Sequence, residues 1–331
     1  MKEQMKNVDV MINNENSMFE EAKDEVLQND DGLNKVIGVG ERSWDGKKFV
    51  KYIIGSFGIA WVLQVIASMM SWKGNQIAFT MILVVCMYAP FAGTLIAGIP
   101  LRGMGWKPRF KGNIKNILLA WFVPVIFTAL GAVLYFVIFP NRLDFTGEYL
   151  RAAGGEAVME QLAAAGITPK MYLLIGLIQC LTYAPLMNMF AALGEEVGWR
   201  GAMQPMLNDR FGKRVGRIIG GVIWGAWHWP VMTLAGYEYG LNYWGYPILG
   251  MVTFCLFTIA AGTLEDSLYE KSKSIWIPSL MHGSINAIAT VPMMVGGSAY
   301  MDQMILGPVP MGLISGIPLA IIAIVVLAKE K

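Results

Sequence analysis

Eight long apolar stretches constrain the fold of this chain more than any other feature of its sequence. They lie at approximately residues 50–72, 76–99, 114–139, 171–193, 215–235, 244–264, 275–296 and 305–328. A helix rises about 1.5 Å per residue, so each stretch is long enough to cross a hydrocarbon core of roughly 30 Å. Apolar residues make up 55% of the chain and charged residues 15%, a balance outside the range of soluble domains.

The apolar character of each stretch is continuous rather than alternating. A membrane β-strand would alternate between lipid-facing and lumen-facing residues and would span in about ten residues. Continuous stretches of this length favour helices, whose backbone hydrogen bonds are satisfied within each segment. We therefore expect an all-α, polytopic membrane bundle with about eight transmembrane helices.

The basic residues predict the orientation of this bundle. Short cytoplasmic loops collect Lys and Arg, and 22 of the 26 basic residues fall in the two terminal segments and in the loops after the second, fourth and sixth stretches. Both termini of this multi-pass protein are therefore predicted to be cytoplasmic. Residues 1–48 are polar and predict a flexible cytoplasmic tail, and residues 49–331 the membrane domain. The net charge is only +2, and nothing supports nucleic-acid binding.

One long connection is predicted on the non-cytoplasmic side. Residues 140–170 have a helix-prone middle with apolar residues near helical spacing at Leu150, Val158 and Leu162. The segment is either a cap or lid on the membrane surface or a solvated linker.

The stretch "GEEVGWRG", residues 194–201, places two carboxylates and an arginine among apolar neighbours. By the predicted spans, this pair is the only acidic site embedded in the membrane, and no aspartate lies within a span. A charge near the bilayer centre costs on the order of 3 kcal/mol or more, so it is usually kept for a specific task. Glu196 and Arg200 stand four apart on one helical face and can pair, whereas Glu195 is rotated about 100° away.

Glu195 is thereby left for a different partner. A free carboxylate in apolar surroundings is suited to take a proton from water, which makes Glu195 a candidate general base. The alternative is a charge cluster at a helix end that the membrane interface solvates.

The chain has only two histidines, and both lie within predicted spans. Trp224 precedes His228 by four residues, so an indole on the same helical face can wall the imidazole from lipid. His282 and Asn286 also stand four apart on one face. Either these polar groups meet the carboxylates in one site, or each is an ordinary interhelical hydrogen-bond partner contributing about 1 kcal/mol.

These residues carry a resemblance to a known family. "EEVGWR" matches a motif EExxxR at Glu195, Glu196 and Arg200. "WGAWH" is similar to FxxxH, with tryptophan in place of phenylalanine before His228, and "HGSIN" matches HxxxN. In order and spacing the three blocks resemble the signature of the CAAX protease and bacteriocin-processing (CPBP, or ABI) family of intramembrane proteases, which includes the type II CAAX prenyl proteases. The resemblance covers roughly residues 171–296.

The resemblance implies an endopeptidase that hydrolyses peptide bonds of membrane-associated proteins or peptides, which in some members are prenylated. It implies that Glu195 activates water with the help of His228, and that His282 and Asn286 orient the water or stabilise the oxyanion. Members that remove the last three residues of prenylated proteins have a cytoplasm-facing opening. We therefore expect a peptide or lipidated protein substrate, approached from the cytoplasmic side of the lipid bilayer.

The resemblance also implies that Glu196 and Arg200 fix the reacting groups from behind, and it leaves two interpretations of the cofactor open. Glu195, His228 and His282 could hold a divalent metal such as zinc in a three-ligand site with an open position for water. However, the chain has no HExxH motif, and the similarity to prenyl proteases implies a glutamate and histidine site that needs no metal. The metal-free interpretation is slightly favoured.

Other chemistries fit the sequence less well. An aspartyl protease needs two membrane aspartates and a rhomboid-like serine protease needs a GxSG loop, and the predicted spans offer neither. The alternative from a different class is a transporter, or a non-catalytic membrane binding or immunity protein, in which the same polar cluster binds a proton, an ion or a peptide.

Overall fold

The computed structural model describes residues 42–330, apart from the side chains of residues 299–302. Within this range the secondary structure is helical, with no strand beyond an isolated bridge between Leu143 and Gly296, which confirms the predicted all-α class. The α-helices are α2 (Gly46–Trp72), α3 (Gln76–Cys86), α4 (Ala89–Ile96), α5 (Ile114–Ile138), α6 (Glu148–Ala164), α7 (Pro169–Leu181), α8 (Ala184–Gly198), α9 (Gln204–Phe211), α10 (Lys213–Trp227), α11 (Trp229–Ala235), α12 (Ile248–Ser272), α13 (Trp276–Ile288) and α14 (Ile317–Lys329). The remaining helical segments are η1 (Pro140–Arg142), the π-helical η2 (Trp199–Met203), η3 (Val291–Val295) and η4 (Ser298–Leu306).

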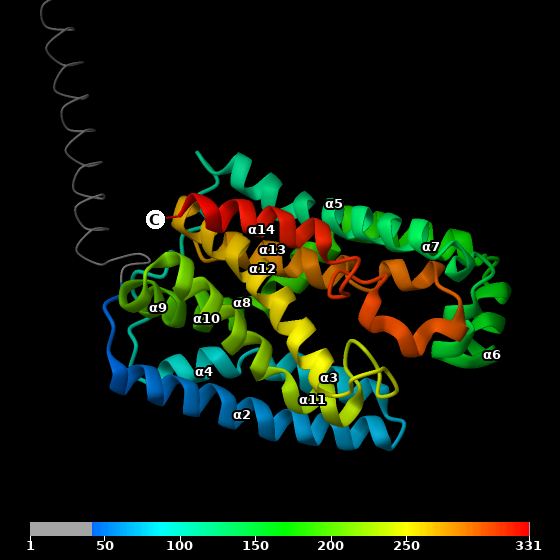
Figure 1. Cartoon of the computed structure of the whole chain (residues 1–331), viewed down its shortest axis with the longest axis horizontal. Coiled ribbons are helices and arrows are strands. Elements are labelled where there is room, and N and C mark those ends of the chain that lie inside the picture. The colour runs from blue at the N-terminus through cyan, green and yellow to red at the C-terminus, as the bar shows by residue number, and fades with distance from the viewer. Residues whose placement is uncertain (1–41, 331) are drawn as a thin grey trace, which may run out of the picture. The chain divides into compact units, whose positions relative to one another are not determined.

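The long helices run roughly alongside one another and define two ends of the bundle (Figure 1). The start of α2, helix α9 and the last turn of α14 lie at one end, which we call the terminal end. The turn from α2 into α3 and helix α6 lie toward the opposite end, which we call the far end. Helix α13 packs along α8, and α10 packs along α12, so these four helices form the centre of the bundle.

The structure has fewer long spans than the sequence predicts. In the described part of the chain, five helical segments are long and apolar enough to cross a membrane, or six if the bent pair α6 and α7 is one span. The difference from eight arises in the fourth, seventh and eighth apolar stretches, which are divided into shorter helices. Pro185 and Pro292 follow two of these breaks directly, because proline lacks the N–H that a continuing helix needs.

The sixth span extends further than predicted. Helix α12 continues to Ser272 and carries Glu265 and Asp266, whose exposed fractions are 0% and 2%. The prediction that Glu195 and Glu196 are the only embedded acidic residues, with no aspartate in a span, is therefore wrong. An apolar window ends where charged residues begin, but a helix continues wherever its neighbours satisfy those charges.

The predicted connection at 140–170 contains the whole of α6, which meets α7 at an angle of 88°. Asp144 begins it, since its Oδ2 accepts hydrogen bonds from the backbone N–H groups of Thr146 (3.0 Å), Gly147 (2.9 Å) and Glu148 (3.0 Å). Leu150 is the only residue of α6 that is fully buried. The segment is thus helical and largely exposed, and its position relative to a membrane surface stays a prediction.

Most of the predicted tail, residues 1–41, lies outside the described residues. The last residues of that segment contact the bundle. The backbone N–H of Trp44 donates to Asp209 at 2.8 Å, and Asp45 accepts from the N–H groups of Lys47 and Lys48 at the start of α2. Residues 42–48 therefore hold the beginning of α2 near the end of α9.

A glycine permits the close contact between α8 and α13. A Cβ atom on Gly283 would lie 2.5 Å from the backbone N of Met189 and 2.6 Å from the carbonyl oxygen of Pro185. Small residues allow membrane helices to approach at the backbone. The preceding residue, His282, is thereby brought against the carboxylates of α8.

Candidate active site

Glu195 is buried on the last turn of α8, with an exposed fraction of 2%. Its Oε2 accepts two indole hydrogen bonds, from Trp199 Nε1 at 3.0 Å and from Trp224 Nε1 at 2.8 Å. Both donors bind the same oxygen, so the carboxylate is held in one orientation. No hydrogen bond from the described residues occupies Oε1, which is left for a ligand.

Glu196 points to different partners. Its Oε1 lies 2.9 Å from His282 Nδ1, and its Oε2 lies 3.3 Å from Arg200 Nε. The Arg200 contact is within ion-pair range but lacks hydrogen-bond alignment. The predicted pair four residues apart is therefore present. Arg200 also forms an ion pair with Glu265 of α12 and lies over the ring of Trp224, 4.8 Å from its centroid.

His228 occupies the break between α10 and α11. Its Nδ1 lies 3.0 Å from the carbonyl oxygen of Trp224, and a carbonyl can only accept, so Nδ1 carries the proton and Nε2 is the free acceptor. Aromatic rings surround the imidazole: those of Trp227 and Phe254 have centroids within 5 Å, and the Tyr237 ring is nearly parallel to it at 6.2 Å. These rings fix its orientation.

The indole of Trp224 does not wall His228 from lipid as predicted. It donates to Glu195, and its ring centroid lies 5.2 Å from that of His282. Helix α10 ends at Trp227, and the ring contacts of His228 come from Trp227, Tyr237 and Phe254.

One cavity of about 550 Å³ brings the predicted groups together. Glu195, His228, His282 and Asn286 all line it. They come from α8, from the α10–α11 break and from α13, segments far apart in the sequence. Glu196 and Arg200 do not line the cavity and lie buried behind it.

The residues suggested as metal ligands are not grouped as predicted. Among the described residues, the one set of three ligand atoms within 4.8 Å of one another comes from Glu196, Glu265 and His282, not from Glu195, His228 and His282. The guanidinium of Arg200 pairs with both carboxylates of the observed set and already supplies a positive charge there. This donor set fits an arginine-centred ion-pair cluster better than a metal site.

Two residues of the site, Gln64 and Glu238, were not predicted from the sequence. Gln64 of α2 is buried and spans the α10–α11 break, donating to the carbonyl of Trp227 at 2.8 Å and accepting from the N–H of Val231 at 3.2 Å. A glutamine within an apolar span is a signal that could have identified it. Glu238, between α11 and α12, also lines the cavity, but its loop position gave no such signal.

Two comparisons with known proteins found similar sequences. Residues 176–288 match the family described as "Type II CAAX prenyl endopeptidase Rce1-like". The chain is also 22% identical over 241 residues to a protein named "CAAX prenyl protease 2" from Methanococcus maripaludis, and the match covers 71% of this chain and 81% of that protein. The family match contains Glu195, His228, His282 and Asn286, and its limits are close to the 171–296 core expected from the motifs. Residues 176–288 of this chain are therefore similar to the Rce1-like CAAX prenyl endopeptidase domain, and 241 residues of the chain are similar to a CAAX prenyl protease.

Proposed function

We propose that this protein is an intramembrane endopeptidase in which Glu195 activates a water molecule for attack on a peptide carbonyl. The family match supports an endopeptidase within the membrane. The observation that carries the residue assignment is the shared cavity, into which three separate helical segments project four polar side chains.

The two indole hydrogen bonds determine what Glu195 can do. They hold Oε2, so Oε1 is the oxygen directed to the water. Nε2 of His228 is a second acceptor, because its Nδ1 proton is bound to the Trp224 carbonyl. Two acceptors of fixed orientation can align one water and receive its proton, as general-base catalysis requires.

The other side of the cavity supplies donors. The amide of Asn286 can donate to the oxyanion of the tetrahedral intermediate, and His282 can do so when its Nε2 carries a proton. Its Nδ1 is held by Glu196 at 2.9 Å, which directs Nε2 away from α8. As the intermediate collapses, the proton taken by Glu195 passes to the leaving amine, and the C–N bond breaks. This sequence of proton transfers needs no metal ion.

Glu196, Arg200 and Glu265 support this arrangement from behind. The guanidinium neutralises two buried carboxylates, and Glu196 in turn orients His282. A buried charge is costly unless it is paired, so these three residues act as one positioning unit. The expected substrate is a peptide or protein associated with the bilayer, and both termini are proposed to be cytoplasmic on the distribution of basic residues.

Purified protein incubated with a peptide library in proteoliposomes tests this proposal. Glu195→Gln should abolish cleavage, and Asn286→Ala should lower kcat about 100- to 1000-fold, the usual loss for one oxyanion donor. Glu156→Gln is the matched control, because Glu156 is exposed on α6 and its ion pair among the described residues is with Arg151. A chelator should leave the wild-type rate unchanged.

Two outcomes would contradict this proposal. A Glu195→Gln variant that melts like wild type and still cleaves would refute the base assignment. If wild type binds peptides but cleaves none of them, the non-catalytic alternative replaces the enzyme.

A further inference from the structure

The cavity extends from the catalytic groups in one direction only. Helix α10 runs from the terminal end and contributes its final turn, with Trp224 and Trp227. Helix α12 runs in the opposite direction and contributes Phe254 and Phe257 from its first half. Helix α13 contributes residues from His282 to its C-terminal end. All three helices therefore line the cavity with the portions nearer the far end.

The remaining lining residues agree with this direction. Thr80 lies in the first turns of α3, directly after the turn at the far end, and Thr290 follows the end of α13. Both side chains are exposed. The loop after α11 adds Tyr237 and Glu238.

Toward the terminal end the site is closed by buried ion pairs. Arg200 lies between Glu196 and Glu265 behind the catalytic groups. Closer to the terminal end, Arg217 has an exposed fraction of 1% and pairs with Asp266 at 2.7 Å. No residue of these pairs lines the cavity, so this layer separates the cavity from the terminal end.

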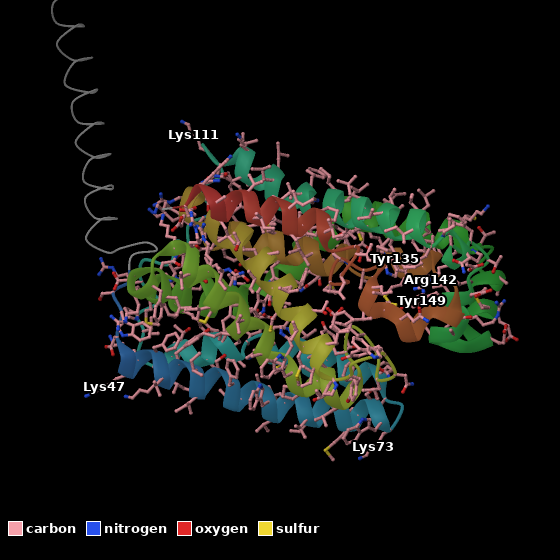
Figure 2. The ribbon with its side chains drawn as sticks, viewed as in Figure 1. Lys47, Lys73, Lys111, Tyr135, Arg142 and Tyr149 are labelled. Atoms are coloured by element: carbon pink, nitrogen blue, oxygen red, sulfur yellow. The ribbon has the colours of Figure 1, made fainter. Side chains whose placement is uncertain are left out.

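Charge assigns the two ends to the two sides of the membrane. Figure 2 shows Lys47 and Lys111 at the terminal end, whereas Lys73 and Arg142 lie toward the far end. The terminal segments and the loops on their side hold 22 of the 26 basic residues. Because basic loops are retained in the cytoplasm, the far end is non-cytoplasmic. The two sequence predictions, cytoplasmic termini and a cytoplasmic opening, are thus incompatible in this fold.

We propose that the catalytic cavity opens toward the non-cytoplasmic side, so that the substrate is a polypeptide segment at the outer surface or in the outer half of the bilayer. That a substrate occupies the cavity rests on the proposed function. The direction of the opening does not depend on proteolysis. Segments of exported or membrane-anchored polypeptides reach this side. The cytoplasmic tails of prenylated proteins do not.

Cysteine accessibility in intact cells tests the direction. The native cysteines Cys86, Cys180 and Cys255 are buried and free, so they are first replaced by alanine. Single cysteines are then introduced at Thr290 in the cavity, at Lys73 at the far end and at Lys47 at the terminal end. A membrane-impermeant maleimide is added before or after permeabilisation.

The proposal expects Thr290→Cys and Lys73→Cys to react in intact cells, and Lys47→Cys only after permeabilisation. Labelling of Thr290→Cys only after permeabilisation, or not at all, would overturn it. Thr80→Cys repeats the measurement if Thr290→Cys fails to fold. Adding Glu195→Gln to each variant should leave the pattern unchanged, so failure of the catalytic proposal is distinguished from failure of this one.

The charge of the cavity independently supports a second inference. Glu195 and Glu238 both line the cavity, but none of the described lysines and arginines does. Glu238 has a left-handed backbone (φ 71°) between Gly236 and Gly240, which also have positive φ. Because a non-glycine residue adopts this conformation only when its surroundings hold it, the position of Glu238 is well defined.

We infer that Glu238 is a specificity residue that disfavours a free carboxyl terminus in the cavity and favours an internal peptide segment. Where Glu238 is ionised, its carboxylate repels another anion that enters the same cavity. The test uses pairs of peptides that are identical except for a free or an amidated C-terminus placed three residues after the scissile bond.

Wild type should cleave the amidated peptide with the lower KM, and Glu238→Gln should reduce that difference several-fold while kcat changes little. Equal KM values for the two peptides in wild type, or a preference that Glu238→Gln leaves intact, would overturn the inference. Glu156→Gln again serves as the exposed control.

Discussion

The two indoles that hold Glu195 allow a stability measurement that isolates one contact of the site. Trp224→Phe removes the N–H that donates to Glu195 Oε2 at 2.8 Å, and it introduces the phenylalanine of the FxxxH motif. The substitution also removes buried volume, so its total effect on unfolding free energy mixes two causes. Combining it with Glu195→Gln separates them, because the volume change is the same in both backgrounds.

The expected coupling follows from the charge of the acceptor. A hydrogen bond to a charged group contributes about 1.5–3 kcal/mol and a neutral one about 0.5–1.5 kcal/mol. Trp224→Phe should therefore cost about 1–1.5 kcal/mol more when residue 195 is a carboxylate than when it is an amide. This difference corresponds to about a 5- to 13-fold change in the unfolding equilibrium constant.

Reversible unfolding in mixed detergent micelles measures the four variants. Trp227→Phe is the matched control, since Trp227 is equally buried but its indole N–H has no acceptor among the described residues, so its coupling to Glu195→Gln should be near zero. The same cost of Trp224→Phe in both backgrounds would refute the conclusion that the indole fixes an ionised carboxylate.

Three further predictions address packing and charge. Gly283→Ala should destabilise the fold by about 1–3 kcal/mol and reduce cleavage, because its Cβ would press on α8; Gly58→Ala, with open space around its Cβ, is the control, and equal melting of both variants would contradict the packing argument. Asp266→Ala should lower unfolding free energy by about 3 kcal/mol by leaving buried Arg217 with only its more exposed partners, and a loss no larger than that of an exposed pair would contradict this. Burial raises the pKa of Glu238 to about 7, against a hydrogen bond from Tyr237 that lowers it. The proton bound by Glu238 therefore makes its full contribution to the free energy of unfolding below about pH 4.5. This contribution is lost as the pH rises through 7. Glu238→Gln should melt increasingly above wild type as the pH rises from 5 to 8, and a constant difference in melting temperature would show that the carboxyl does not titrate there.

Spacing along the chain predicted contacts correctly where one helix decides the geometry. Glu196 and Arg200 pair as their spacing predicts, because residues four apart face one another on any helix. It failed where a helix ends: Trp224 and His228 have the same spacing, but the chain leaves the helix at Trp227 and the indole contacts Glu195 instead.

Three of the predicted spans are not single long helices, for a related reason. Hydropathy measures the apolar content of a window, and the fourth, seventh and eighth stretches are apolar enough to qualify. These stretches break at prolines and in 3-10 turns, and neighbouring helices stabilise the breaks. A hydropathy window carries no information about those neighbouring helices. The same limit concealed Glu265, which looks like the start of a loop until Arg200, 65 residues earlier, is placed against it.

By itself, the sequence determined that the chain is an all-α membrane protein, and its three motifs identified four polar side chains that line the cavity. Both conclusions depend on composition and on local spacing, which can be read from the sequence without knowing which helices pack together. Only the tertiary structure decided that Trp199 and Trp224 hold one oxygen of Glu195, that Glu265 completes the pairing of Arg200, and that the cavity extends toward the far end. These features depend on distances between helices, which are set by how closely α8, α10, α12 and α13 pack.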